Sequence, residues 1–349
     1  MKPTKYFLFL LLIAISAIGI AQSKTQVLYF GHAGWTGKIN HDKDIENQNA
    51  FNTGGFDLFL TSNLDERLSV LGELFMGFKG DGGTLVDFNI ERLYFKYRVS
   101  DVLNVKIGRQ YTPMGFWNNT YTQGIVFQPT INRPYSVRNA NDKGVLTTNS
   151  VGLQIDGEDI GGTQFSYYFM VDNTAGAPSI NTDNTTSKAY TGKLKFEPVL
   201  DWDVFVSVRF DKVVAGAESI QGIVQPNDVD QSIYNVGFAH ITITSPVELA
   251  FEYFRVVNDV NTVGKSQNNL GYGYAGYRIN KWTPYLQYDF LDYDEADTYF
   301  DPATTTGLVV GARYNFTPSS VIKLEYKYRD IEGRTDRQDV FSVQVAAVF

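Results

Sequence analysis

The chain has 349 residues, of which 15% are aromatic and none is cysteine, and its formal net charge is -8 at pH 7. The aromatic content is too high for a disordered chain, and the missing cysteines exclude a disulfide scaffold and a thiolate metal site. The acidic balance argues against a nucleic-acid partner, because phosphate binding needs a clustered positive face. After residue 20 no run approaches the roughly 18 apolar residues of a spanning helix, which excludes a bundle of membrane-spanning helices.

The start of the chain has the features of a Sec-type signal peptide. Lys2 and Lys5 give a positive beginning, residues 7–20 form a short apolar core, and a small-x-small cleavage site follows it. We therefore expect residues 1–21 to be removed on export and residues 22–349 to form the mature protein. An uncleaved anchor helix is the alternative interpretation of this segment.

Strand periodicity runs through the rest of the chain. In residues 202–211, 247–253 and 322–329 an apolar face alternates with a face that carries full charges. The same alternation, with uncharged partners, continues through 341–349 to the last residue. Sixteen strands are predicted, near 26–36, 55–62, 68–78, 86–98, 103–111, 150–156, 163–172, 188–196, 202–211, 232–243, 246–257, 269–279, 282–291, 306–316, 321–329 and 339–349.

Short and long connections alternate between these strands. Thr244-Ser245 and Asn280-Lys281 are tight turns, whereas residues 37–54, 212–231 and 258–268 are predicted to be long polar loops. Short connections at one end of a sheet and long connections at the other are typical of an outer-membrane barrel, which has short periplasmic turns and long extracellular loops.

Aromatic residues mark both ends of several apolar faces. They stand eight residues apart in the pairs Trp202 and Phe210, Trp282 and Phe290, and Phe341 and Phe349. Eight steps of about 3.3 Å along a strand tilted by about 40° climb roughly 20 Å, close to the apolar band of a transmembrane barrel. A soluble β-sandwich is the alternative, but its dry core would not accept so many inward charges. The predicted fold is therefore all-β, a transmembrane antiparallel β-barrel of sixteen strands.

Together, the leader, the strand pattern and the aromatic last strand resemble a bacterial outer-membrane porin. Phe341–Phe349 is similar to the terminal signal read by the outer-membrane insertion machinery. Residues 106–115 (KIGRQYTPMG) are similar to a strand and loop opening in phosphate-selective porins of the O/P type. The resemblance implies passive diffusion of small hydrophilic solutes or ions through a water-filled barrel, in the outer membrane of a Gram-negative bacterium. It also implies contact with outer-membrane lipid and lipopolysaccharide, no cofactor, and a homotrimer as a hypothesis.

The longest connection, residues 112–149, is the candidate constriction loop. It is rich in aromatic residues and proline and carries more bases than acids, which is unusual for a simple surface connector. In sixteen-stranded porins the corresponding loop folds into the barrel and narrows the pore, so the resemblance implies that role here. An extracellular cap or a loop that latches subunits together is the alternative. The candidate residues of this loop are Phe116, Trp117, Arg133, Arg138 and Lys143.

Alternation also assigns charged residues to the lumen, where rings of charge set ion preference. The candidate pore-lining residues are Glu73, Arg92, Lys96, Arg98, Lys106, Arg209, Glu248, Glu252, Lys323 and Lys327. Four of the bases, Arg92, Lys96, Arg98 and Lys106, are expected beside the root of the constriction loop and favour anions. The negative net charge favours cations, so the sequence leaves the sign of the selectivity open.

No catalytic residue and no metal ligand is predicted. The chain has only three histidines, at 32, 41 and 240, and none stands in a recognisable nucleophile, metalloprotease or P-loop motif. The acidic segment 292–301 lacks the spacing of a calcium-binding EF-hand loop, so a hydrated loop is favoured. Two alternatives to a porin remain, which are a non-conducting barrel that acts as an adhesin or structural protein and, less favoured, a barrel enzyme.

Overall fold

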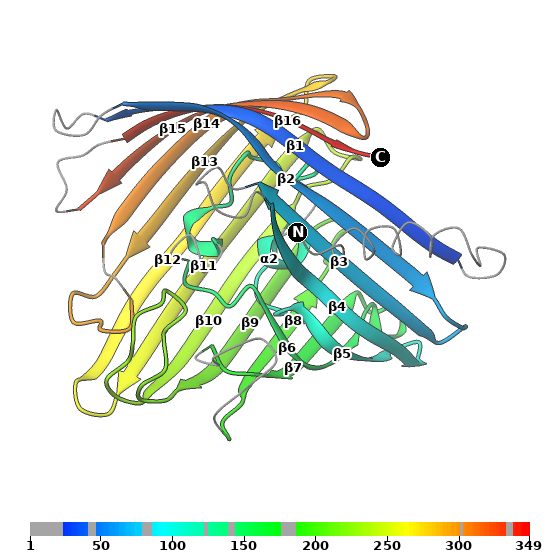
Figure 1. Ribbon diagram of the computed structural model, residues 1–349. Helices are drawn as coiled ribbons and strands as arrows, with labels where there is room; N and C mark the ends of the chain where they lie inside the picture. The colour runs from blue at the N-terminus through cyan, green and yellow to red at the C-terminus, as the bar shows by residue number, and fades with distance from the viewer. Residues whose placement is uncertain are drawn as a thin grey trace, which may run out of the picture.

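The computed structural model describes residues 24–40, 47–78, 86–121, 125–138, 144–175, 186–300, 303–332 and 338–349. In these residues sixteen strands form one closed antiparallel barrel (Figure 1). Each strand pairs with its neighbours in sequence, and β1 closes the ring against β16. The predicted fold class is confirmed, while the expected leader, residues 1–21, lies outside the described residues.

The strands are β1 (Lys24–Asn40), β2 (Gln48–Asn63), β3 (Leu68–Phe78), β4 (Val86–Ser100), β5 (Leu103–Tyr111), β6 (Asn149–Gly157), β7 (Phe165–Asp172), β8 (Ala189–Phe196), β9 (Asp203–Val213), β10 (Val229–His240), β11 (Val247–Val260), β12 (Gly264–Tyr277), β13 (Trp282–Asp292), β14 (Thr305–Thr317), β15 (Ser320–Ile331) and β16 (Gln338–Val348). The helical segments are short, namely α2 (Trp117–Thr120), η1 (Tyr135–Val137) and η3 (Ile160–Gly162). Within the described part of the chain, no helix has both the length and the apolar character needed to cross a membrane.

Two of the predicted loops are wrong at the loop end of the barrel, the end opposite the short turns. The predicted loop 258–268 is a continuation of β11 and β12, which only residues 261–263 connect. The predicted loop 37–54 is likewise mostly strand, because β1 runs to Asn40 and β2 begins at Gln48. Polar composition there marks the end of the apolar band, but the hydrogen-bond ladder continues beyond it, with Asp259 opposite Lys265.

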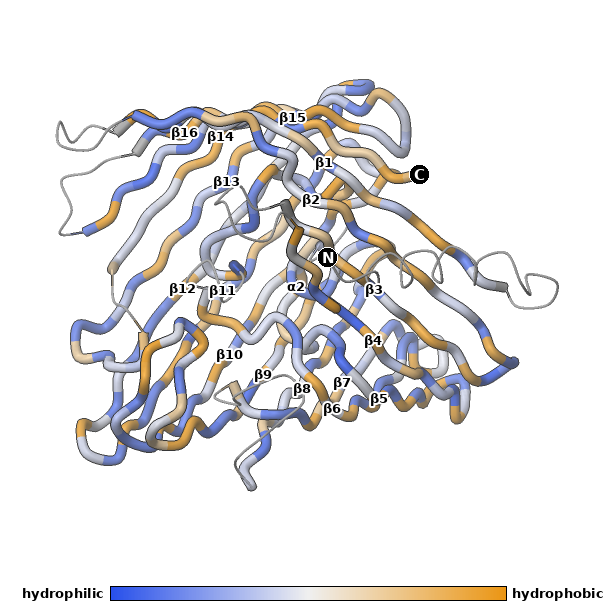
Figure 2. The backbone as a smooth tube through the Cα atoms, viewed as in Figure 1, coloured by the Kyte–Doolittle hydropathy of each residue, from blue (hydrophilic) through white to orange (hydrophobic). Residues whose placement is uncertain are grey.

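The two faces of each strand differ in polarity and in exposure. On β9 the inward Phe205, Ser207 and Arg209 are buried, whereas the outward Val206 and Phe210 are 50% and 48% exposed. Figure 2 shows the resulting alternation of apolar and polar residues along the strands. An exposed apolar face is the reverse of a soluble protein and is suited to lipid.

Aromatic pairs gather on the outward face at two levels. At the short-turn end they are Trp202–His240 (4.5 Å between ring centroids), Trp282–Tyr314 (4.8 Å) and Tyr29–Phe349 (5.8 Å). At the loop end they are Phe210–Tyr234 (6.4 Å), Tyr253–Phe290 (6.4 Å) and Tyr326–Phe341 (4.9 Å). Aromatic residues are enriched in this way where a barrel meets the two membrane–water interfaces, and each level forms an aromatic belt.

Candidate functional site

The segment between β5 and β6 is described at residues 112–121, 125–138 and 144–148, and these residues lie inside the ring of strands. Figure 1 shows α2, which belongs to it, within the barrel. Its described residues make hydrogen bonds to inward side chains of β8, β9, β11, β13, β14 and β15. Because these strands lie around the ring from β5 and β6, the segment crosses the interior, and we call it the inner loop.

Glu252 of β11 holds the beginning of the inner loop. Its carboxylate accepts hydrogen bonds from the backbone N–H groups of Phe116 (3.0 Å) and Trp117 (2.9 Å) and from the hydroxyl of Tyr272 (2.8 Å). Lys193 of β8 donates to the carbonyl oxygen of Gly115 at 2.6 Å. Two charged side chains thus form hydrogen bonds with backbone N–H and C=O groups of the loop, which would otherwise be buried without partners.

Aromatic packing fixes the same part of the loop. Trp117 is fully buried, with ring centroids 5.6 Å from Tyr272 and 5.2 Å from Tyr121. Phe116 stacks on the inward Phe205 of β9 at 6.4 Å. The predicted loop residues Phe116 and Trp117 therefore pack against the wall instead of facing water.

The far part of the loop is held by the opposite wall. Lys323 of β15 donates to the carbonyl oxygens of Ile125 (2.6 Å) and Thr130 (3.1 Å). Glu325, two residues along, accepts from the N–H of Ile131 at 2.6 Å. In its described part the inner loop is therefore attached to the wall at residues 115–117 and again at 125–131.

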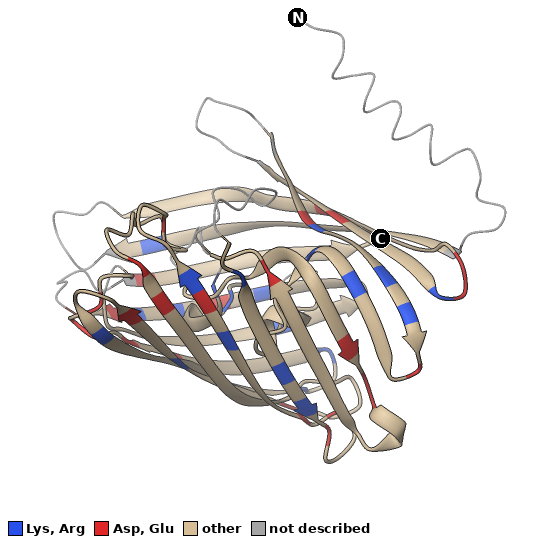
Figure 3. Ribbon diagram, turned by 90° about the horizontal axis from the view of Figure 1, so that it is seen from below, with Lys and Arg blue, Asp and Glu red and all other residues tan. Residues whose placement is uncertain are grey.

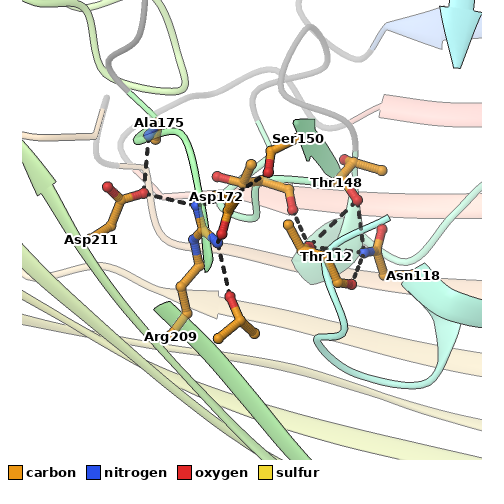
Figure 4. A network of polar contacts seen from close by, with 10 residues as sticks. Thr112, Asn118, Thr148, Ser150, Asp172, Ala175, Arg209 and Asp211 are labelled. Atoms are coloured by element: carbon orange, nitrogen blue, oxygen red, sulfur yellow. Dashed lines mark hydrogen bonds and ion pairs between the residues drawn. The ribbon is translucent and has the colours of Figure 1, made fainter. Parts of the chain in front are cut away.

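A buried network lies next to the root of the loop (Figure 4). Asn118 donates to the carbonyl oxygens of Thr112 and Thr148, each at 3.0 Å, which ties the two stems together. Nearby, the guanidinium of Arg209 donates to Asp172 through two bonds of 2.9 Å and to Asp211 at 3.1 Å. Arg209 is 1% exposed, so this predicted pore-lining residue joins β7 to β9 inside the wall.

Between the inner loop and strands β1, β2, β15 and β16 lies a cavity of about 600 Å³, which we call the upper chamber. It lies toward the loop end, and Glu91 is the one carboxylate among its described lining residues. Its basic lining residues are Lys38, Arg133, Arg138, Lys327 and Arg329. Bases therefore outnumber acids by five to one among the described charged residues that line this chamber.

A second cavity of about 280 Å³, the lower chamber, lies toward the short-turn end. Its charged lining residues are Arg92, Lys106, Lys193, Lys195, Glu158 and Asp203. Several of these bases are paired with acids. Arg92 bonds Glu73 at 2.5 Å, and Lys106 bonds Asp156 at 2.8 Å. This chamber is therefore more balanced in charge than the upper one.

Lys96 and Arg98 do not lie beside the root of the loop, where the strand pattern predicts them. Both line a third cavity, at the short-turn end, together with Asp65, and the guanidinium of Arg98 donates to the carbonyl oxygen of Glu66 at 2.8 Å. The reason is the length of β4, since Arg98 stands six positions after Arg92 along the strand. In the same turn, hydrogen bonds from the backbone N–H groups of Arg67 and then Leu68 lower the pKa of Asp65.

The remaining predicted residues divide into two groups. Glu248 is fully buried and binds Arg313 at 2.6 Å and Arg278 at 3.0 Å. Like Glu73, Arg209, Glu252 and Lys323, it is occupied by wall or loop partners. Arg92, Lys96, Arg98, Lys106 and Lys327 line cavities, as do Arg133 and Arg138, while Lys143 lies outside the described residues. Alternation gives the face on which a charge lies but not its partner, so it could not separate these groups.

The acidic segment 292–301 is organised by hydrogen bonds in its described part. Asp297 accepts bonds from Asn258, Ser266 and Asn268 of the neighbouring hairpin and from the backbone N–H groups of Tyr299 and Phe300. Across the residues that the structure describes, no group of three or more histidine or acidic side chains is arranged to hold a metal ion.

Comparison with known sequences decides the family. A sequence model described as Gram-negative porin matches residues 9–334. The chain belongs to the Gram-negative porin family. None of the curated proteins matches it significantly.

Several solved structures share the fold of this porin at low sequence identity. An anion-selective porin from Comamonas acidovorans is similar with a TM-score of 0.66 and 14% identity, over 94% of this chain and 100% of the other. OmpF of Salmonella typhi, in complex with daunomycin, is similar with a TM-score of 0.66 and 14% sequence identity, over 93% of this chain and 97% of the other. OmpT of Vibrio cholerae, folded in vitro and in a trimer form, is similar with a TM-score of 0.60 and 14% sequence identity, over 93% of this chain and 99% of the other. The protein is an outer-membrane channel for the passive diffusion of small hydrophilic solutes.

Proposed function

We propose that this porin prefers small anions and that the upper chamber is its filter. The observation that carries the proposal is the charge of that chamber, where five bases face one described carboxylate. Neither Lys327 nor Arg329 has an ion-pair partner within 4.0 Å in the described part of the chain, so no acid neutralises them directly. Wall charges of one sign raise the local concentration of the opposite ion.

The inner loop acts in this proposal as the constriction. It brings Arg133 and Arg138 to the same chamber as Lys327 and Arg329 of β15, so a solute there meets bases of both the loop and the wall. The loop donates backbone hydrogen bonds to Glu252 and Glu325 and accepts one from Lys323, and these bonds hold it in place inside the barrel. A solute leaving the upper chamber then meets Arg92 and Lys106 in the lower chamber.

The acidic net charge of the chain does not oppose this proposal. Acids and bases are both spread over the strands (Figure 3), and several inward acids are occupied by N–H and guanidinium partners. Glu248 and Glu252 are fully buried in such contacts. Ion preference depends on the charges that face the water path rather than on the total.

Further parts of the proposal concern processing and assembly. We propose that residues 1–21 are removed on export, since they have a charged start, an apolar core and a cleavage site.

The trimer form of OmpT supports a homotrimer here. The outward apolar face with its aromatic belts supports contact with outer-membrane lipid and lipopolysaccharide. Enzymatic activity is not part of the proposal, because no histidine stands in a catalytic motif.

The test is planar-bilayer conductance of the refolded mature protein under a salt gradient. We expect stepwise conductance and a reversal potential that reports anion preference. In the variant Lys327→Gln/Arg329→Gln the anion-to-cation permeability ratio should fall by about twofold or more, since one charge about 10 Å from an ion is worth roughly 0.4 kcal/mol even in water. Lys212→Gln is the control, because Lys212 is an exposed partner of Asp228 at the end of β9.

Three outcomes would contradict parts of the proposal. A cation-selective wild-type channel would remove the filter but keep the porin. An anion-selective channel that Lys327→Gln/Arg329→Gln leaves unchanged would move the filter to other bases. A folded, heat-modifiable barrel that does not conduct would instead favour an adhesin or structural protein.

A further inference from the structure

One aromatic ring holds three cations of the upper chamber. The ring centroid of Tyr135, in η1 of the inner loop, lies 3.9 Å from the guanidinium carbon of Arg138 and 4.1 Å from Nζ of Lys327. The guanidinium carbon of Arg329 lies 5.2 Å from the same centroid. A cation within about 6 Å of an aromatic centroid is attracted by the negative face of the ring. The two cations of β15 and the one of the loop therefore share a single platform.

The platform itself is fixed in position. The backbone N–H of Tyr135 donates to Asp289 of β13 at 3.2 Å, and the side chain is 3% exposed. The ring lies against Gly307 of β14, where an added Cβ would stand 2.7 Å from Cε2 of Tyr135. Since real Cβ atoms do not approach that closely, Gly307 provides the space that the ring occupies.

The ring offsets the mutual repulsion of the cations that line the upper chamber. Like charges on flexible side chains repel one another and turn toward any nearby carboxylate. Asp289 and Glu325 lie on the same walls and attract Lys327. For Lys327 and Arg329, an aromatic face supplies attraction without cancelling their charge, whereas a bound carboxylate would cancel it.

We infer that Tyr135 is a specificity-determining residue of this channel, which positions Arg138, Lys327 and Arg329 through its aromatic ring. The inference rests on the proposed anion filter and goes beyond it, because it assigns the filter's charge placement to an uncharged side chain. Gly307 contributes to this positioning, since its missing side chain leaves the space in which the Tyr135 ring lies.

The test compares Tyr135→Leu with Tyr135→Phe by reversal potential under a salt gradient. In Tyr135→Leu the anion-to-cation permeability ratio should fall by about twofold or more, although no charge has been removed. Tyr135→Phe keeps the ring and should keep the wild-type ratio. Heat-modifiable mobility in gel electrophoresis identifies the folded barrel in each preparation.

A second variant displaces the ring and leaves Tyr135 in the chain. Gly307→Ala places a Cβ where the ring lies, so it should lower the permeability ratio as Tyr135→Leu does. Gly273→Ala is the matched control, because an added Cβ at Gly273 would meet no atom within 4 Å. Gly273 is on β12, so both substitutions add a methyl group to a strand.

The outcomes separate this inference from the proposed filter. If Lys327→Gln/Arg329→Gln lowers the ratio but folded Tyr135→Leu and Gly307→Ala do not, the positioning role is wrong and the filter stands. If neither class of variant changes the ratio, the filter itself fails. If Tyr135→Phe behaves as Tyr135→Leu, the hydroxyl and not the ring face is responsible, which also overturns the inference.

Discussion

At the scale of the residue, the inward charges of this barrel have two different tasks. Glu252 and Lys323 give their hydrogen-bonding capacity to backbone atoms of the inner loop. Lys327 and Arg329 instead line the upper chamber. Both pairs lie on inward faces, so their strand positions alone do not distinguish them. What distinguishes them is whether a buried polar atom of the loop lies within reach.

Glu252→Ala is expected to loosen the inner loop. It leaves the N–H groups of Phe116 and Trp117 without an acceptor, at about 1–3 kcal/mol for each buried donor. We expect a folded channel with noisier single-channel current than the wild type, measured in planar bilayers. Asp203→Ala is the control, because Asp203 is an inward acid that pairs with Lys195. Equal noise in both variants would show that lost charge, and not a lost anchor, is the cause.

At the scale of the element, strands are joined by buried polar networks as well as by their ladders. Arg209 lies on β9 and binds Asp172 of β7, and its partner Asp211 accepts a bond at 3.0 Å from the N–H of Ala175 (Figure 4). The network therefore attaches the connection after β7 to β9. Its position at the loop end, beside the root of the inner loop, supports the shortest strands of the barrel.

Arg209→Met should destabilise the barrel strongly. Removing the guanidinium leaves two buried carboxylates without their counter-charge, which costs about 3–5 kcal/mol in comparable buried pairs. The measurement is the temperature at which the folded form loses its faster mobility in gel electrophoresis. Lys212→Met on the same strand removes an exposed pair with Asp228 and should cost at most about 1 kcal/mol. Equal losses for the two variants would contradict a structural role for Arg209.

At the scale of the whole molecule, Phe349 extends the β1–β16 ladder that closes the barrel by one more pair. Tyr29 and Phe349 exchange backbone hydrogen bonds of 2.9 Å and 3.0 Å, and their rings stack at 5.8 Å. The ring of Phe56 lies 6.4 Å from that of Phe349, so the first, second and last strands meet in one aromatic group.

Phe349→Ala is expected to weaken closure only modestly once the barrel has formed. The backbone bonds remain, and the loss of aromatic pairing is about 0.5–1.5 kcal/mol. In cells the yield of folded barrel should fall much further, because Phe341–Phe349 resembles the signal read by the insertion machinery. Comparing heat-modifiable protein from refolding in detergent with that from outer membranes measures both effects. An undiminished yield in the outer membrane would argue against the terminal signal.

The sequence by itself determined the class of fold, the number of strands and the alternation of inward and outward residues along strands such as β9. Lipid outside and water inside impose a period of two residues on every strand, and that signal is local. The same signal misplaced the loops at 37–54 and 258–268, because polarity ends with the membrane while the ladder continues.

Only the tertiary structure decided which charges remain to act on a solute. Phe116 and Glu252 are 136 residues apart in sequence, and Tyr135 meets Gly307 from another part of the chain. Contacts of this kind depend on how one loop lies across a closed ring. No local periodicity records that arrangement, so the charge of the upper chamber had to be taken from the structure.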